Sequence, residues 1–260
     1  MKYTYEEIAK MIDHSLLHPT MTDQDLEDGC RLAARYGVAS VCIKPYAVRR
    51  AKELLEGSGV YVGCVIGFPH GNSCTESKRY ETGLACSDGA DEIDMVINTG
   101  KALSGEWEYV EQDVKAVCDE AHQHGARVKV IFENDFLTEG GAGLDSDEFK
   151  RKLCQICERA GADWVKTSTG YGFVKQADGS YAYKGATEHD LTLMRNNCSE
   201  KVQVKAAGGV RDLDGLIKVR DLGGTRCGAT ATAAMLDEYR RRETDGDSST
   251  DSAEIGVGGY

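Results

Sequence analysis

Two lysines stand near the ends of two short apolar segments, and each is followed by small residues and glycine. Lys166 lies in DWVKTSTG (163–170), and Lys205 lies in VQVKAAGGVR (202–211). Burial of a lysine is costly because desolvation disfavours the ammonium form, so a single strand-end lysine is as easily explained by a side chain that reaches to water. The second lysine in the same setting favours a site with two amines on neighbouring strands.

A carboxylate, Asp94, lies within a third apolar stretch, DEIDMVIN (91–98). A nearby like charge and partial desolvation both lower the pKa of a lysine, and a neutral lysine attacks a carbonyl to form a Schiff base. The resulting iminium withdraws electrons from the neighbouring carbon, while a carboxylate moves protons. Lys166, Lys205 and Asp94 therefore predict imine chemistry, although these residues alone do not decide which lysine is the nucleophile. The alternative for Asp94 is a strand-end carboxylate that simply pairs with a lysine.

Short β-branched runs alternate with amphipathic helical patterns along almost the whole chain. Strands are expected at 11–16, 39–43, 60–67, 91–98, 127–133, around Lys166, around Lys205 and at 225–229. Continuously apolar strands separated by helices indicate a parallel sheet that is buried on both faces. Eight of them in this length predict an α/β fold of the closed (β/α)8 type, in which the carboxyl ends of the strands form the active-site face. An open doubly wound sheet is the alternative, but no G-x-G-x-x-G follows the first strand.

The expected organisation is one catalytic barrel domain over residues 1–242, with a hairpin-like insertion at about 171–184 and a flexible tail at 243–260. Within the insertion, FVK (173–175) and YAY (181–183) flank Asp178 and Gly179, a strong hairpin signal. Every formal charge after Arg242 is acidic, and Ser, Thr and Gly dominate, which predicts a disordered tail.

Composition narrows the classes of partner. The chain has 260 residues and a formal net charge of −12, which argues against a general surface for nucleic acid or anionic membranes. No apolar run approaches the roughly 20 residues of a membrane span, and the first residues lack the apolar region of a signal peptide. A cytoplasmic location is expected, with the ten cysteines acting mostly as small apolar residues.

Metal-binding patterns are weak. Cys154 and Cys157 form a single C-x-x-C within a helical pattern, without a second cysteine pair. His122 and His124 are two residues apart on an expected helix, so they face different directions. We therefore predict no metal site and no cofactor.

Glycine-rich turns follow the two last expected strands. Gly208 and Gly209 follow the Lys205 strand, and Gly228 and Thr230 belong to the turn GATA (228–231). In barrels of this kind, phosphate often binds to backbone N–H groups of these two loops and to a helix N-terminus. Glycine pairs also serve tight turns, but the two together indicate a phosphate site.

Several ordered motifs resemble those of the deoxyribose-phosphate aldolase family, the class I aldolases that work through a Schiff base. They span about residues 13–236: DHSLL (13–17), SVCIKP (40–45), VIGFP (65–69), DEIDMVIN (91–98), VKTSTG (165–170) and KAAGGVR (205–211). The resemblance implies reversible cleavage of 2-deoxy-D-ribose 5-phosphate to D-glyceraldehyde 3-phosphate and acetaldehyde. It also implies small phosphosugar and aldehyde partners, no cofactor, and a homodimer or higher homo-oligomer.

The resemblance also implies roles for single residues. Lys166 matches the Schiff-base lysine, Lys205 the second lysine that perturbs it, and Asp94 the proton-relay carboxylate. Tyr260, at the end of the tail, is a further candidate for proton transfer beside the imine carbon. The alternative for Tyr260 is a terminal residue without any role.

The substrate and phosphate set expected from these motifs is Gly170, Gly208, Gly209, Gly228 and Thr230. The family usually carries a Ser-Ser pair in the turn after the eighth strand, where this chain has GATA (228–231) and keeps only one hydroxyl, so weakened rather than abolished phosphate binding is expected.

The long insertion at 171–184 is either a lid that brings Lys175 or Lys184 to the phosphate, or a surface decoration or subunit contact. Two other functions stay open: a related barrel lyase that acts on a different phosphosugar or an unphosphorylated aldehyde, and a non-catalytic sugar-phosphate binding protein.

Overall fold

The computed structural model describes residues 1–246 and Ile255. The predictions for the remainder of the tail, including the one for Tyr260, lie outside these described residues. Helix α10 (Thr232–Asp245) continues past the end predicted near Arg242, and Gly246 caps it in the left-handed conformation. The first residues assigned to the tail are therefore helical, because they extend a helix that already packs on the barrel.

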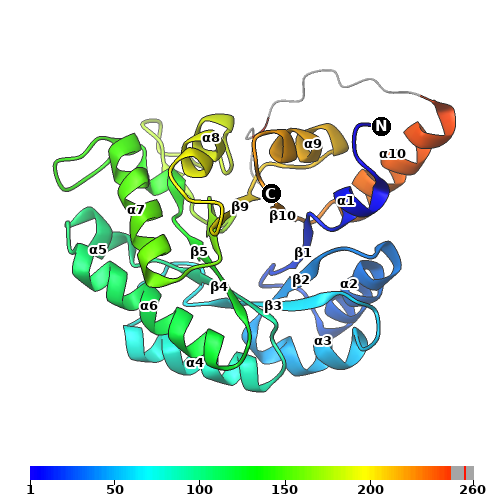
Figure 1. Cartoon of the computed structure of the whole chain (residues 1–260), viewed down its shortest axis with the longest axis horizontal. Coiled ribbons are helices and arrows are strands. Elements are labelled where there is room, and N and C mark those ends of the chain that lie inside the picture. The colour runs from blue at the N-terminus through cyan, green and yellow to red at the C-terminus, as the bar shows by residue number, and fades with distance from the viewer. Residues whose placement is uncertain (247–254, 256–260) are drawn as a thin grey trace.

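Eight parallel strands close into a barrel, as the alternation of apolar runs predicts (Figure 1). They are β1 (Ile12–Leu16), β2 (Ser40–Ile43), β3 (Tyr61–Ile66), β4 (Glu92–Val96), β5 (Arg127–Ile131), β6 (Trp164–Lys166), β9 (Gln203–Ala207) and β10 (Arg226–Ala229). Their order around the barrel is β1-β10-β9-β6-β5-β4-β3-β2, so each strand pairs with its neighbour in the chain and β10 closes onto β1. This confirms the (β/α)8 prediction.

Helices pack around the outside of the barrel (Figure 1). The main ones are α2 (Asp23–Tyr36), α3 (Val48–Leu54), α4 (Thr75–Ser87), α6 (Trp107–Gln123), α7 (Ser146–Ala160), α8 (Glu188–Asn196), α9 (Leu213–Asp221) and α10. Short helices precede β1 and follow β4, namely α1 (Tyr5–Ala9) and α5 (Thr99–Leu103), and 3-10 turns cover η1 (Pro45–Ala47) and η2 (Asn134–Leu137).

Local sequence explains where helix α2 begins and ends. Thr22 is its N-cap and shares a reciprocal capping box with Asp25, and Gly37 ends it in the left-handed conformation. Such caps satisfy backbone groups that a helix leaves unpaired.

Strand register places the charged residues at matching heights inside the barrel. Lys166 on β6 lies beside Lys205 on β9, and Asp94 on β4 lies beside Lys129 on β5. Arg226 on β10 is in register with Lys205. Because side chains alternate between the two faces of a strand, these pairings decide which polar groups meet in the interior.

The predicted hairpin is present. Strands β7 (Val174–Lys175) and β8 (Tyr181–Ala182) pair antiparallel, and Gly179 has a φ of 86° in the connecting turn. That left-handed conformation suits glycine, which lacks a Cβ atom.

Candidate active site

Lys166, Lys205 and Asp94 meet at one carboxylate oxygen. The Nζ atoms of Lys166 and Lys205 each donate a hydrogen bond of 2.7 Å to Asp94 Oδ2. All three side chains are almost fully buried. The structure thus brings together the three residues that the sequence predicts for catalysis. Lys166 is the last residue of β6, whereas Asp94 and Lys205 are the middle residues of β4 and β9.

A larger ion network surrounds this hub, and sequence reasoning missed it. Lys129 Nζ lies 3.0 Å from Asp94 Oδ1 and 2.5 Å from Glu92 Oε2. Asp13 Oδ2 pairs with Lys205 at 2.6 Å, and Arg226 bridges Asp13 and Glu92. The available signal was spacing, because Glu92 and Asp94 are two residues apart and therefore share one face of β4.

The buried network contains three carboxylates and four cations when all its groups are ionised. The carboxylates are Asp13, Glu92 and Asp94, and the cations are Lys129, Lys166, Lys205 and Arg226. Unpaired charge is expensive in such a setting. Loss of one proton from one lysine therefore balances the buried charge.

The contacts indicate which lysine loses that proton. Burial lowers the pKa of Lys166, and the charge on Lys205 lowers it further, while Asp94 is its sole carboxylate partner among the described residues. Burial also acts on Lys205, but Asp13 and Asp94 outweigh it and hold that pKa well above its usual value. Lys129, beside three carboxylates, likewise has a raised pKa. Lys166 is thus the network lysine that is best prepared to be neutral.

Asp94 is held as an anion. Burial raises its pKa, but the charges of Lys129, Lys166 and Lys205 outweigh burial and place the pKa well below its usual range. At neutral pH this carboxylate is therefore ionised, so it accepts hydrogen bonds and carries no proton to donate.

A small apolar cluster lies beside the hub. Leu17, Cys42 and Val65 pack together with Phe68 and Tyr171, whose rings meet edge to face at 5.5 Å. The Cys42 sulfur is 3.9 Å from Asp94 Oδ2, and burial raises the pKa of its thiol to about 11. This cluster offers an apolar surface next to the lysine amines.

A pocket of about 330 Å³ opens at the carboxyl ends of β9 and β10. Gly208, Gly209, Gly228 and Thr230 line it, as the sequence predicts. Gly170, Lys175 and Lys184 are not among its lining residues, and both lysines are exposed. The lining also includes polar side chains that sequence reasoning did not predict for this site, namely those of Ser15, Tyr183 and Arg211.

The first turn of α10 adds backbone donors to this pocket. Its N-cap residue, Ala231, lines the pocket and makes no side-chain cap hydrogen bond. An N-terminus without a side-chain cap presents N–H groups to an anion. The Ala-Thr turn therefore keeps backbone donors in spite of the hydroxyl that it lacks.

Glu133, just after β5, is a buried carboxyl that sequence reasoning did not single out. It occupies the left-handed region with a φ of 57°, and burial raises its pKa to about 7. Thr169 donates to it through both its backbone N–H and its hydroxyl, and Tyr171 N–H donates to the Thr169 hydroxyl at 2.9 Å. Glu133 thereby holds the turn that follows Lys166.

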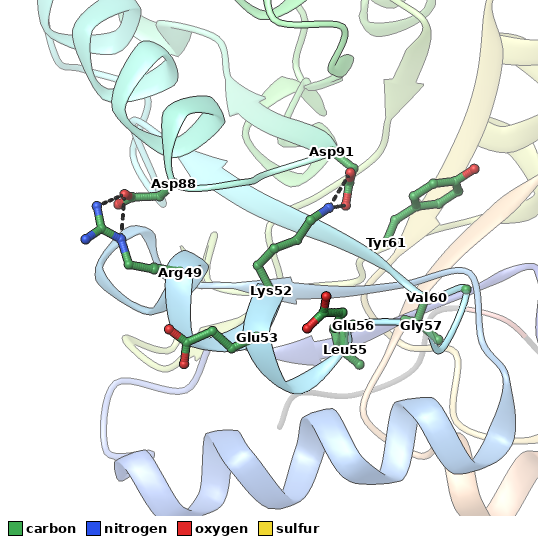
Figure 2. A pocket seen from close by; sticks show the side chains of 11 residues that line it. Arg49, Lys52, Glu53, Leu55, Glu56, Gly57, Val60, Tyr61, Asp88 and Asp91 are labelled. Atoms are coloured by element: carbon green, nitrogen blue, oxygen red, sulfur yellow. Dashed lines mark hydrogen bonds and ion pairs between the residues drawn. The ribbon is translucent and has the colours of Figure 1, made fainter.

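A larger hollow, of about 520 Å³, lies at the opposite end of the barrel (Figure 2). Its side chains come from α3 and from the residues that precede β3 and β4, where Arg49 pairs with Asp88 and Lys52 with Asp91. These ion pairs are largely exposed, and exposed pairs contribute little energy. The larger volume of this hollow therefore does not identify it as the active site.

The fold and the paired lysines define a class of lysine-dependent barrel enzymes. A family model described as DeoC/LacD family aldolase matches residues 7–230. The deoxyribose-phosphate aldolase of Rhodopirellula baltica is 49% identical over 240 residues, which cover 92% of each chain. The chain belongs to the DeoC/LacD aldolase family.

Two further relatives are named as the same enzyme. The deoxyribose-phosphate aldolase of Clostridium perfringens is 44% identical over 232 residues, covering 89% of this chain and 95% of the relative. The tetrameric deoxyribose phosphate aldolase of Aeropyrum pernix superposes with a TM-score of 0.77 at 29% identity, covering 91% and 92% of the two chains.

The described residues, 1–246 and Ile255, contain no helix that is long and apolar enough to cross a membrane. They also contain no group of three or more histidine, cysteine, aspartate or glutamate side chains arranged to hold a metal ion.

Proposed function

We propose that this enzyme reversibly cleaves 2-deoxy-D-ribose 5-phosphate to D-glyceraldehyde 3-phosphate and acetaldehyde through an imine on Lys166. The observation that carries the proposal is the difference between the barrel lysines. Lys166 has a lowered pKa and one carboxylate partner, whereas Lys129 and Lys205 have several carboxylate partners and raised pKa values. The family and its curated relatives support the same activity.

In the cleavage direction, neutral Lys166 attacks the aldehyde carbon of the open-chain sugar, and loss of water gives a protonated imine. The iminium draws the electron pair of the C2–C3 bond toward nitrogen as the C3 hydroxyl loses its proton. Glyceraldehyde 3-phosphate leaves, and the remaining enamine takes a proton at C2. Addition of water to the new imine releases acetaldehyde and returns the Lys166 amine.

Asp94 and Lys205 assist these reaction steps through one carboxylate oxygen, Asp94 Oδ2. Because Asp94 Oδ2 contacts both Nζ atoms, protons gained and lost at the Lys166 nitrogen have an adjacent acceptor and a charged neighbour. Lys205 keeps the hub positive, which favours the neutral form of Lys166.

The pocket beside β9 and β10 suits the phosphate end of the substrate. Its glycine turns bring backbone N–H groups close to a ligand, the first turn of α10 adds more, and Arg211 supplies a positive charge at the rim. The apolar cluster around Cys42 and Val65 suits the two-carbon end.

Borohydride reduction in the presence of acetaldehyde, followed by peptide mass mapping, tests the imine. We expect the added ethyl group on Lys166. Absence of any adduct would rule out the imine mechanism, and an adduct on Lys205 would reverse the two roles. Treatment with EDTA is expected to leave aldolase activity intact.

We also propose that the chain works as a homo-oligomer in the cytoplasm, with residues 1–242 as one catalytic domain. The tetrameric Aeropyrum pernix relative supports self-association. Tyr260 remains a candidate for proton transfer at the enamine carbon. Its removal should slow hydrogen exchange on acetaldehyde more than it weakens substrate binding, and an unchanged exchange rate would end that assignment.

A further inference from the structure

The base of the inserted hairpin is fixed to the phosphate pocket. The backbone N–H groups of Lys184 and Gly185 donate to the Asp135 carboxylate at 2.5 and 3.0 Å. The N–H of Ala186 donates to the carbonyl of Gly208 at 3.1 Å. Gly208 belongs to one of the two glycine turns that line the pocket, so the hairpin and that turn are directly joined.

This attachment places the ring of Tyr183 in the pocket wall. Tyr183 is buried, and its ring packs edge to face against Phe173 on the other side of the hairpin, with ring centres 5.2 Å apart. A Cβ atom added to Gly208 would lie 3.1 Å from the Tyr183 ring and 3.0 Å from Gly185 Cα. The ring and the hairpin base therefore cover the Gly208 turn closely.

Covering the pocket in this way strengthens its hydrogen bonds to a phosphate group. Hydrogen bonds from backbone N–H groups and from a guanidinium to an anion strengthen when water is excluded from them. Burial also raises the pKa of Tyr183, so this wall carries no negative charge at neutral pH. A neutral aromatic wall excludes water without repelling the ligand.

We propose that Tyr183, placed by the hairpin, is a specificity-determining residue that encloses the phosphate end of the substrate. This inference rests on the proposed function and adds to it a selection for phosphorylated over unphosphorylated sugars. The enclosure comes from the ring. The hairpin is therefore a fixed wall of the pocket, in which neither Lys175 nor Lys184 needs to reach the phosphate.

The test compares Tyr183→Ala with Tyr183→Phe and with Tyr181→Ala, a matched control on the same hairpin whose side chain is 64% exposed. Steady-state kinetics are measured with 2-deoxyribose 5-phosphate and with 2-deoxyribose, and the Kd of inorganic phosphate is measured by calorimetry. For Tyr183→Ala we expect KM for the phosphate ester and the phosphate Kd to rise about tenfold, with kcat/KM for 2-deoxyribose within about twofold of wild type. Tyr183→Phe should stay within about threefold and Tyr181→Ala within about twofold on every measure.

Three results would overturn the assignment. They are an unchanged phosphate Kd in Tyr183→Ala, an equal loss of kcat/KM on both sugars, and a loss in Tyr183→Phe as large as that in Tyr183→Ala. Wild-type enzyme that is inactive on both sugars would instead refute the proposed function. The phosphate Kd of the variants would still test the wall in that case, because it does not depend on turnover.

Discussion

The two ends of the barrel carry similar kinds of charge in different surroundings. At the amino end, Lys52 pairs with Asp91 across a hollow open to water (Figure 2). In the interior toward the carboxyl end, Lys166 pairs with Asp94 where neither side chain is more than 3% exposed. The donor–acceptor distance is 2.7 Å in both pairs, yet burial shifts the pKa of Lys166. The depth of the pair, and not its length, therefore decides how strongly burial acts on the pKa of the lysine.

The largest effect should come from the buried lysine. Lys166→Met removes the nucleophile, so we expect kcat to fall by roughly 10⁴-fold or more, with no borohydride-trapped adduct. Circular dichroism and the unfolding midpoint should show that the barrel persists, because Asp94 keeps Lys129 and Lys205 as partners. Substantial residual turnover with trapping at another lysine would contradict the assignment.

The neighbouring lysine should change the pH profile as well as the rate. Lys205→Met removes a like charge that lowers the pKa of Lys166, so the Lys166 pKa should rise. We expect kcat/KM to fall about 10²-fold at pH 7 and its rising limb to move to higher pH. A reduced rate with an unmoved pH profile would show that Lys205 acts by some other route.

Glu133 should make stability depend on pH. Because burial raises its pKa to about 7 from 4.5, the folded chain holds a proton that the unfolded chain has already released between these values. The unfolding free energy should therefore fall by roughly 3 kcal/mol from this group as pH rises from 4.5 to 7. Denaturant titrations of Glu133→Gln should show a flatter profile over this window.

Asp135 also contributes to the pH dependence of the unfolding free energy. Burial raises its pKa as well, so part of the slope should remain in Glu133→Gln. Asp13 and Asp94 act in the opposite direction, because their lowered pKa values stabilise the fold above pH 4 and lose that effect as pH falls. If the unfolding free energy of Glu133→Gln depended on pH just as that of wild type does, the pKa of Glu133 would not be raised in the folded chain.

The smallest effect should come from the amino end. Lys52→Met breaks the pair with Asp91, and both side chains have access to water, so we expect at most about 0.5 kcal/mol of lost stability. Aldolase kcat/KM should stay within about twofold of wild type. A large loss of activity would mean that Lys52 at the amino end influences catalysis at the carboxyl end, and would contradict the independence of the two ends.

Much of the barrel was predictable because short runs rich in β-branched residues alternate with helical patterns, and because caps such as Thr22 and Gly37 mark where helix α2 begins and ends. Lys166, Lys205 and Asp94 were predictable because each is a charged residue within a short, mostly apolar segment, and the two lysines stand in similar segments that run into glycine. Lys129 and Arg226 were not, since alternation along a strand shows which residues share a face but not whether that face turns toward the barrel interior.

Tyr183 was missed for a different reason. Its place depends on a backbone contact between Ala186 and Gly208, two segments whose meeting is set by the closed barrel and not by local pattern. The same holds for Glu133, whose contacts with Thr169 join two loops that are distant in sequence.

Closure of the barrel has a consequence for synthesis of the chain. Arg226, on the last strand, joins Asp13 on the first strand to Glu92 on the fourth. A nascent chain still lacking β10 has both carboxylates, which Lys129 contacts, but not the guanidinium that joins β10 to the first and fourth strands. Because β10 follows the other seven barrel strands in the sequence, the bridging cation is synthesised after both carboxylates, and only then can the first and last strands of the barrel pair.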